Sequence, residues 1–267
     1  MKASLIQLKM NKDEGREALL SRVMAMVDSC AGSDLIVLPE LWHAGILSYE
    51  TIYDIAESKY GALMTLVSEK AKELKAFIHC GSFVNRIGDK LFNTSILFDR
   101  NGNDVAEYRK IHLFSCIGRE SVMFSHGDKI VVAETELGKI GLAICYDARF
   151  PELFRQMTCE YGAEIFIVPA AWNSLRGNAF RMLNRVRAME NSAVLLSCNL
   201  TGPYKSLQMA GSSAVLDTWG EPLAALEEEE EILHAKFCVE DIRRMRADFP
   251  VFNDIRLLRK PDFARSN

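Results

Sequence analysis

Three residues that can do acid–base or nucleophilic chemistry each follow an apolar, strand-like run in the sequence. They are Glu40, Lys110 and Cys145. In open α/β folds, functional sites form beyond the ends of such strands, where loops converge on a rigid base. A carboxyl group, an amine and a thiol brought together can act as base, electrophile and nucleophile. Each also has an ordinary alternative, as a helix cap, a surface amine or a small buried side chain, so spacing alone gives only a hypothesis.

The residues around these three strengthen the hypothesis. The segments LPE (residues 38–40), RKIHLF (109–114) and AICYDARFPE (143–152) occur in this order along the chain. They resemble the three signature segments of the nitrilase superfamily. Further segments that resemble this superfamily extend over nearly the whole chain, namely VPAAWN (168–173), RAMEN (187–191), GSS (211–213), WGE (219–221) and FPVF (249–252).

The resemblance implies a catalytic triad of Glu40, Lys110 and Cys145, in which Cys145 attacks the carbon of an amide. An unperturbed thiol has a pKa of about 8.5 and is mostly protonated at neutral pH, so the attack needs a base. Glu40 would accept the thiol proton and later pass a proton to the departing amine. Lys110 and the backbone N–H of Tyr146 would stabilise the oxyanion. The expected products are a thioester and ammonia, and a water molecule activated by Glu40 would then release the carboxylic acid.

Four further side chains are predicted to support catalysis or to bind the substrate. Glu120 matches a second glutamate beside the triad, although an exposed loop acid is the alternative. Arg149 is expected either to bind a substrate carboxylate through its planar guanidinium or to hold loops together through carbonyl oxygens. Trp172 and Asn173 are expected at the mouth of the pocket, although Trp172 also fits plain core packing.

The segment around Cys145 and the FPVF tail resemble the omega-amidase branch, which hydrolyses the terminal amide of short 2-oxo diacid monoamides. Ala179 and Phe180 depart from its pattern, because close relatives carry a His-Trp pair there, and this leaves the substrate open. An N-carbamoyl amidohydrolase or a nitrilase on the same triad is the alternative. Two hypotheses come from other classes: a cysteine–histidine hydrolase using His112 or His126, and a non-catalytic binding protein that retains the fold.

The resemblance implies a small-molecule amide as the ligand, and the composition argues against other kinds of partner. A net charge of −4 gives no general attraction to nucleic acid or to an anionic membrane, and no apolar run approaches the roughly 20 residues that span a bilayer. The five histidines lack metal-ligand spacing, so we expect no metal and no organic cofactor. Seven scattered cysteines and a start without a signal peptide favour the cytoplasm. The acidic run at residues 227–231 is predicted to be a solvated turn rather than a cation site.

Strand-like and helical segments alternate without a linker, which predicts a single domain over residues 1–267 with a mixed α/β fold. The resemblance implies more: a four-layer α-β-β-α sandwich that forms a homodimer or a higher homo-oligomer. Helices are expected after Asn11, whose side chain would cap the first one, and at residues 61–74, 151–161, 177–191 and 241–247. Strands are expected at residues 2–8, 34–40, 76–84, 91–98, 105–108, 138–145, 164–169, 193–199, 211–217 and 232–239.

Overall fold

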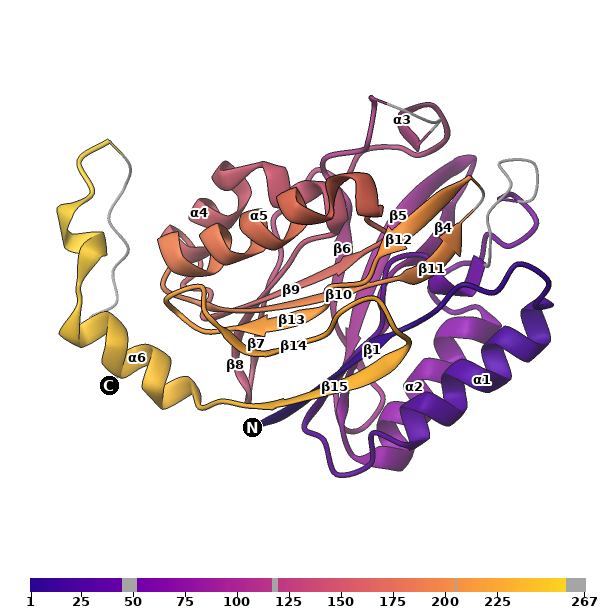
Figure 1. Ribbon diagram of the computed structural model, residues 1–267, viewed down its shortest axis with the longest axis horizontal. Helices are drawn as coiled ribbons and strands as arrows, with labels where there is room; N and C mark the ends of the chain where they lie inside the picture. Colours follow the sequence, from indigo (N-terminus) through magenta and orange to yellow (C-terminus); the bar gives the residue numbers. More distant parts are fainter. Residues whose placement is uncertain (45–51, 117–119, 205, 258–267) are drawn as a thin grey trace.

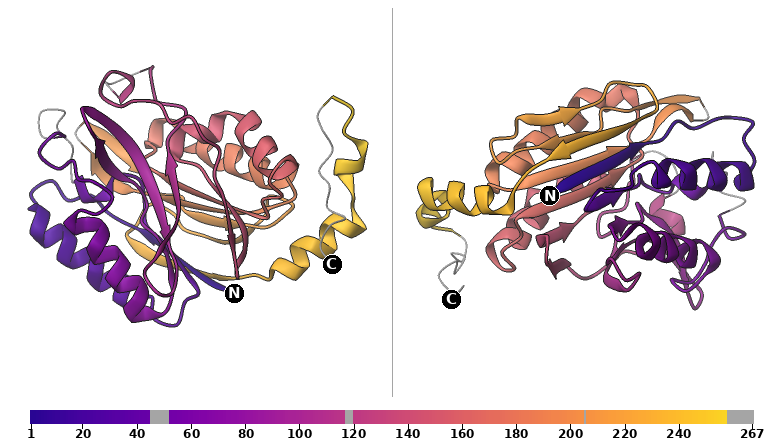
Figure 2. Two further views of the ribbon diagram at one scale, coloured as in Figure 1. Left: turned by 180° about the vertical axis from the view of Figure 1, so that it is seen from behind. Right: turned by 90° about the horizontal axis from the view of Figure 1, so that it is seen from below.

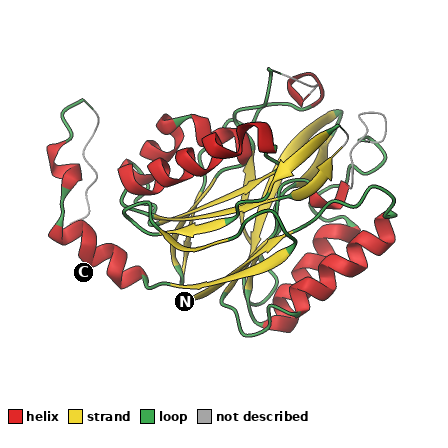
Figure 3. Ribbon diagram, in the orientation of Figure 1, coloured by secondary structure: helices red, strands yellow, loops and turns green. Residues whose placement is uncertain are grey.

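Two β-sheets lie face to face, and helices cover the outer face of each (Figures 1 and 3). The computed structural model of the chain describes residues 1–44, 52–116, 120–204 and 206–257. Figure 2 shows the same arrangement from behind and from below, with one pair of helices on each side of the sheets. The layers therefore run helix, sheet, sheet, helix, which confirms the four-layer α-β-β-α sandwich.

The first sheet combines the N-terminal half of the chain with one strand from near the C-terminus. Its strand order is β15-β1-β2-β3-β5-β4, and β6 also pairs with β5. The strands are β1 (Lys2–Gln7), β2 (Leu35–Val37), β3 (Phe77–His79), β4 (Phe83–Ile87), β5 (Lys90–Phe98), β6 (Asp104–Arg109) and β15 (Glu231–Lys236). β1, β2 and β3 are parallel neighbours, whereas β5 and β6 form an antiparallel hairpin around the turn at residues 100–103.

The second sheet has the order β14-β13-β10-β9-β8-β7, and its central strands β8, β9 and β10 are parallel. Its strands are β7 (Val132–Thr135), β8 (Gly138–Leu142), β9 (Ile165–Ala170), β10 (Val194–Asn199), β13 (Ala214–Leu216) and β14 (Pro222–Ala225). A separate hairpin consists of β11 (Thr201–Tyr204) and β12 (Leu207–Ala210). The C-terminal ends of β2 in one sheet and β8 in the other lead into the segments that carry the predicted site.

The longest helices form the two outer layers. Helices α1 (Arg16–Asp28) and α2 (Ala62–Leu74) cover the first sheet, and α4 (Pro151–Cys159) and α5 (Gly177–Glu190) cover the second. The short α3 (Glu120–Met123) lies near the site, while α6 (Val239–Asp248) extends away from the sandwich (Figure 1). The described residues also contain four short 3₁₀ helices: η1 (Trp42–Ala44), η2 (Cys145–Arg149), η3 (Ser174–Arg176) and η4 (Val251–Asp254). No helix in the described ranges is long and apolar enough to cross a membrane.

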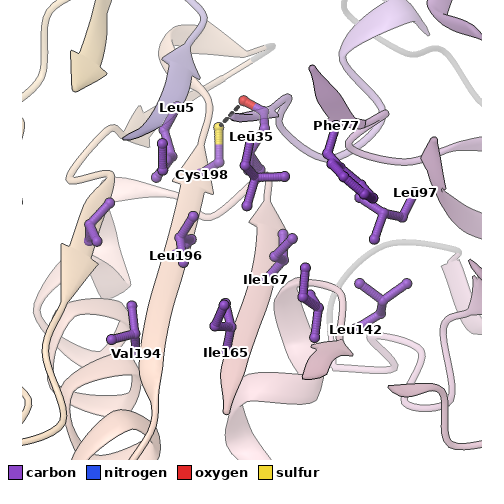
Figure 4. Packing of buried hydrophobic residues seen from close by; sticks show 14 of the residues in the cluster. Leu5, Leu35, Phe77, Leu97, Leu142, Ile165, Ile167, Val194, Leu196 and Cys198 are labelled. Carbon is purple, nitrogen blue, oxygen red and sulfur yellow. Dashed lines mark hydrogen bonds between the residues drawn. The ribbon is translucent and has the colours of Figure 1, made fainter. Parts of the chain in front are cut away.

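Successive side chains of the central strands point to opposite faces, and both faces are covered, which explains why the sequences of these strands are continuous apolar runs. In β9, Ile165 and Ile167 face the other sheet, whereas Phe166 faces the helices. Leu5 and Leu35 approach the same central layer from the first sheet (Figure 4). A strand that is covered on both faces needs apolar side chains at every position, since either face removes its residues from water. The buried layer between the sheets is thus the rigid base beneath the strand ends.

Several expected elements differ in the structure. Helix α1 begins at Arg16 after Gly15, with no side-chain cap, because Asn11 instead bonds the Glu14 side chain 3.4 Å away. The single strand expected at residues 76–84 is two strands, β3 and β4, separated by a bend at Gly81. The sequence interpretation also missed β7, β11, β12 and β14, each of only four residues.

Helix α5 leaves part of its apolar residues exposed and buries polar residues in their place. Val186 and Met189 are 38% and 49% exposed, while the buried face includes Asn184, Arg187 and Ala188. Arg187 is turned inward, where its Nε donates a hydrogen bond to the Ala148 carbonyl oxygen at 3.0 Å. The helix therefore supports η2 with polar contacts and leaves apolar side chains on its outer surface.

Candidate active site

The segment after β2 brings Glu40 to the space between the two sheets. Leu38 donates a backbone hydrogen bond to the His79 oxygen (3.1 Å), which continues the pairing of β2 with β3. Beside it, Gly81 adopts φ +70°, and a Cβ atom there would lie 2.0 Å from the Pro39 oxygen. Only glycine permits this close approach of the two backbones. The Glu40 side chain consequently ends in the interior, where the residue is 4% exposed.

Lys110 meets Glu40 from the end of β6. Its ammonium donates to Glu40 Oε1 at 2.8 Å and to Glu120 Oε1 at 2.7 Å, and the residue is 2% exposed. Its backbone N–H donates to the Asn93 oxygen (2.9 Å), which fixes the chain against β5. Burial alone would lower the pKa of Lys110, but the carboxylates of Glu120 and Glu40 outweigh it and hold that pKa well above its usual range. The site therefore contains a permanent cation.

Cys145 begins η2 directly after the run that contains β8, and its backbone is in the left-handed region at φ 47°. A non-glycine residue pays a steric cost there, and such positions concentrate at functional sites. Burial raises the pKa of the Cys145 thiol well above its ordinary value, and the nearby Glu40 carboxylate raises it further against the opposing charge of Lys110. The resting sulfur is thus a neutral thiol close to the carboxylate of Glu40.

This raised pKa predicts a loss of stability in alkali that depends on Cys145. Above about pH 8.5 the unfolded chain loses the thiol proton while the folded chain keeps it, so the unfolding free energy falls by up to ~1.4 kcal/mol per pH unit from this group. Chemical denaturation of the parent and of Cys145→Ala at several pH values between about 7 and 10 measures the effect. The parent should lose stability faster than the variant as the pH rises, and a constant difference between them would contradict the assignment.

Asn93 is a site residue that the sequence interpretation missed. It lies on β5 with no exposed surface, and its Nδ2 donates to Glu40 Oε1 at 2.8 Å and to Glu120 Oε1 at 3.4 Å. The available signal was an asparagine inside a strand, because asparagine is depleted in strands and costly to bury without partners. Asn93 and Lys110 together hold the two carboxylates in place.

Glu120, at the start of α3, is in contact with Lys110 rather than exposed in a loop. Its second oxygen, Oε2, accepts a hydrogen bond from the Phe114 backbone N–H at 2.9 Å. Glu40 is similarly held, because its Oε2 accepts from the Ala171 N–H at 2.9 Å, just after β9. Both carboxylates therefore have fixed orientations, and only Glu40 also contacts the thiol.

Asp147, also missed, ties the Lys110 segment to the Cys145 turn. Its buried carboxylate accepts hydrogen bonds from the Tyr108 hydroxyl (2.7 Å) and from the Ile144 N–H (2.9 Å). It also lies 2.7 Å from His112 Nδ1 and accepts from the His112 backbone N–H at 3.0 Å. Charge-assisted hydrogen bonds of this kind hold their partners firmly in a buried setting. One carboxylate thus sets the distance between strand ends that belong to different sheets.

The two histidines of the alternative cysteine–histidine hypothesis are engaged elsewhere. His112 bonds Asp147 and stacks on Phe150 with ring centroids 3.7 Å apart. His126 Nδ1 lies 2.7 Å from the Ile111 oxygen. Neither contact involves Cys145, whereas the carboxylate of Glu40 does contact the sulfur.

Arg149, Tyr146 and Trp172 form an aromatic and cationic surface beside Cys145. The guanidinium carbon of Arg149 lies 5.0 Å from the Trp172 ring centroid and 6.0 Å from that of Tyr146. Trp172 is nearly buried, with its ring 5.3 Å from Phe180, so it belongs to the core and supports Arg149 as well. Phe180, one of the two residues that depart from the His-Trp pair of close relatives, is thereby part of the packing behind Trp172.

Asn173 follows Trp172 and pairs through its backbone with Met209 of β12. Its Oδ1 atom is buried without a hydrogen-bond partner. Tyr146 places its hydroxyl 3.7 Å from the sulfur of Cys116. The other five residues predicted for the site thus lie on segments that surround Glu40, Lys110 and Cys145. In the part of the chain that the structure describes, no group of three or more His, Cys, Asp or Glu side chains is arranged to hold a metal ion.

A family model described as carbon-nitrogen hydrolase matches residues 2–247. The chain belongs to the carbon-nitrogen hydrolase family. It is 36% identical over 259 residues to a 2-oxoglutaramate amidase of Paenarthrobacter nicotinovorans, an alignment that covers 94% of this chain and 88% of that protein. It is 31% identical over 265 residues to an omega-amidase of Homo sapiens, with 95% and 94% of the two chains covered.

Solved structures show the same relationship. A CN-hydrolase superfamily protein from Xanthomonas campestris, with an arsenic adduct in its active site, is 28% identical with a TM-score of 0.88, covering 97% of this chain and 98% of that one. Nit3 of Saccharomyces cerevisiae, a member of branch 10 of the nitrilase superfamily, is 30% identical with a TM-score of 0.85 and 94% of each chain covered. The resemblance to the nitrilase superfamily and its omega-amidase-like branch is confirmed, and the protein is a carbon–nitrogen hydrolase of the amidase type.

Proposed function

We propose that this hydrolase cleaves the terminal amide of a short 2-oxo diacid monoamide through a thioester on Cys145. The observation that carries the proposal is that one buried carboxylate, Glu40, contacts both the thiol of Cys145 and the ammonium of Lys110. The names of the relatives supply the substrate class, because one is a 2-oxoglutaramate amidase and another an omega-amidase. The products would be ammonia and the corresponding diacid.

Acylation begins with a proton transfer that the contacts prepare. As the sulfur of Cys145 attacks the amide carbon, its proton moves to Glu40, so the thiolate never has to exist alone in the buried site. The negative charge that develops on the amide oxygen is stabilised by Lys110 and by the Tyr146 N–H, which lies in the first turn of η2, where backbone donors lack helical partners. Glu40 then gives the proton to the departing nitrogen, and the C–N bond breaks.

Deacylation uses the same carboxylate a second time. Glu40 accepts a proton from a water molecule, and the resulting hydroxide attacks the thioester carbon and frees the acid. The sulfur leaves as a thiolate and recovers the proton from Glu40, which returns the site to its resting state. Asn93 and Lys110 hold Glu40 Oε1, so Glu40 keeps its orientation through both steps.

Arg149 is proposed to bind the carboxylate at the other end of the substrate. Its guanidinium lies over two aromatic rings beside Cys145, and no ion pair joins it to any carboxylate among the described residues. A planar guanidinium presents parallel N–H donors that match a carboxylate in a bidentate manner. An arginine held in this way by stacking is available for a ligand.

An ammonia-release panel tests the proposed function. It should include 2-oxoglutaramate, 2-oxosuccinamate, N-carbamoyl amino acids, small nitriles and pentanamide, a neutral amide of similar length. We expect the highest kcat/KM for one of the two 2-oxo acid amides. A higher kcat/KM for a carbamoyl amino acid or a nitrile would contradict the proposed substrate class and would indicate one of those activities on the same triad.

We also propose that the chain acts as a single domain and pairs as a homodimer in the cytoplasm. The outward side chains Met182, Val186 and Met189 of α5 support pairing, because an exposed apolar stripe on a helix is costly in water. Every one of the seven cysteines is a free thiol, as is usual in a reducing compartment. Sedimentation of the parent and of Val186→Asp tests the pairing, with Leu223→Asp, at an exposed site on β14, as the matched control. Only the α5 variant should become monomeric.

A further inference from the structure

A second arginine, Arg176, lies on the same side of the site as Arg149 but comes from a different segment. It ends η3, in the connection between β9 and α5, and its backbone oxygen accepts a hydrogen bond from Trp172 Nε1 at 2.9 Å. Its guanidinium carbon lies 6.0 Å from the centroid of the Phe114 ring. Phe114 is the residue whose backbone N–H holds Glu120 against Lys110. Arg176 is therefore positioned by contacts to residues that build the site.

The aromatic rings beneath the two arginines are in contact with one another. The Phe114 and Tyr146 rings meet edge to face with centroids 5.1 Å apart, and Arg149 lies over Tyr146 and Trp172. The contact with Cys116 is the main cause of a raised pKa of Tyr146, and the charges of Arg149 and Arg176 both act to lower it. Both cations are thus close to the side chain that directly follows the nucleophile.

Neither guanidinium has an anionic partner within residues 1–44, 52–116, 120–204 and 206–257. Some other arginines are paired with carboxylates, such as Arg22 with Glu14 at 2.6 Å and Arg100 with Asp34 at 2.8 Å. Two like charges held on one aromatic surface repel each other, and an anion between them would remove this cost. The arrangement is that of a binding site for a negatively charged group.

We propose that Arg176 is a second substrate-binding residue, which together with Arg149 holds the 2-oxo carboxylate end of the substrate. This inference rests on the proposed function, because it concerns the charged end of the same substrate. A 2-oxo acid presents two carboxylate oxygens and a neighbouring ketone oxygen, and one guanidinium cannot bind all three with good geometry. Two guanidinium groups from separate segments offer enough planar N–H donors for the three oxygens. Selection for a 2-oxo acid over a neutral amide would follow from this pairing.

Arg176→Gln tests the role by comparing a charged with a neutral substrate. The loss of a hydrogen bond between charged groups should lower kcat/KM for 2-oxoglutaramate by about 10- to 100-fold, mainly through KM. The value for pentanamide should stay within about threefold, because that substrate has no charged end to bind. Arg176→Lys should recover part of the loss by restoring the charge without the planar fork. Arg155→Gln is the matched control, since Arg155 rests on Phe252 in a separate pocket that contains none of the site residues.

A second measurement separates binding from damage to the fold. Inhibition of pentanamide hydrolysis by 2-oxoglutarate should weaken about 10-fold or more in Arg176→Gln and remain unchanged in Arg155→Gln. If the parent hydrolyses 2-oxoglutaramate but Arg176→Gln changes neither this inhibition nor the preference between the two amides, the inference is overturned and the proposed function stands. If the parent does not hydrolyse 2-oxo acid amides at all, both the proposed function and this inference are wrong.

Discussion

Replacing Cys145 with alanine should abolish ammonia release, with kcat reduced by at least about 10⁴-fold. The reason is that no other group in the site can form the covalent intermediate: Glu40 and Lys110 are bonded to each other, and Glu120 is bonded to Lys110. Water attacking the amide directly would have to overcome the barrier that the thioester route divides into two smaller ones. The measurement is ammonia release under saturating 2-oxoglutaramate.

Cys116→Ala is the matched control for this variant. Cys116 is an exposed thiol 3.7 Å from the Tyr146 hydroxyl, and so lies close to the site without contacting Glu40. Its replacement should leave kcat within about threefold of the parent. The reverse result, with Cys116→Ala inactive and Cys145→Ala active, would show that Cys116 rather than Cys145 is the nucleophile.

Replacing Lys110 with methionine should damage both stability and activity. The ammonium neutralises two buried carboxylates, so its removal leaves Glu40 and Glu120 facing each other without a cation, at a cost of about 3–5 kcal/mol. Glu40 would also lose the hydrogen bond that fixes its orientation as a base. Loss of the oxyanion partner adds a further ~10²- to 10³-fold reduction of kcat. Denaturant unfolding and ammonia release measure the two effects.

The double variant Lys110→Met/Glu120→Gln separates the two causes. Removing one carboxylate together with the cation restores much of the lost unfolding free energy, because a single buried carboxylate hydrogen-bonded to Asn93 and Ala171 remains. Its activity should nevertheless stay low, because the oxyanion still lacks its cation. Recovery of parent-like turnover in the double variant would show that Lys110 serves the fold rather than the reaction.

The parts of the site that could be predicted from the sequence are those that lie in continuous sequence segments. Glu40, Lys110 and Cys145 each end an apolar run, and their neighbours resemble known signatures, so their types and order could be interpreted together. Their mutual contact depends on the packing of one sheet against the other, which no local pattern encodes. The four-layer arrangement was available only through the resemblance, because apolar runs show that a strand is covered and not what covers it.

The residues that sequence interpretation missed act through long-range contacts. Asn93 is 53 positions from Glu40, and Asp147 is 39 positions from Tyr108, so neither partnership has a spacing signature. The buried face of α5 was hidden for a related reason, since Arg187 turns inward to the Ala148 carbonyl oxygen while Val186 and Met189 remain outside. Arg176 carried no signal at all, because its significance depends on the aromatic rings that lie between it and Arg149.

In the proposed mechanism, one sulfur, one carboxylate and one ammonium act together through a covalent acyl intermediate. Acid-quenched intact-mass measurement during turnover of 2-oxoglutaramate tests this most directly, with the parent compared with Glu40→Gln. We expect a mass increase equal to the substrate minus ammonia, located on the peptide that contains Cys145. In Glu40→Gln the adduct should both form and hydrolyse more slowly than in the parent, because no carboxylate accepts the thiol proton or activates water. Turnover by the parent without any such adduct, or an adduct on another residue, would contradict the mechanism.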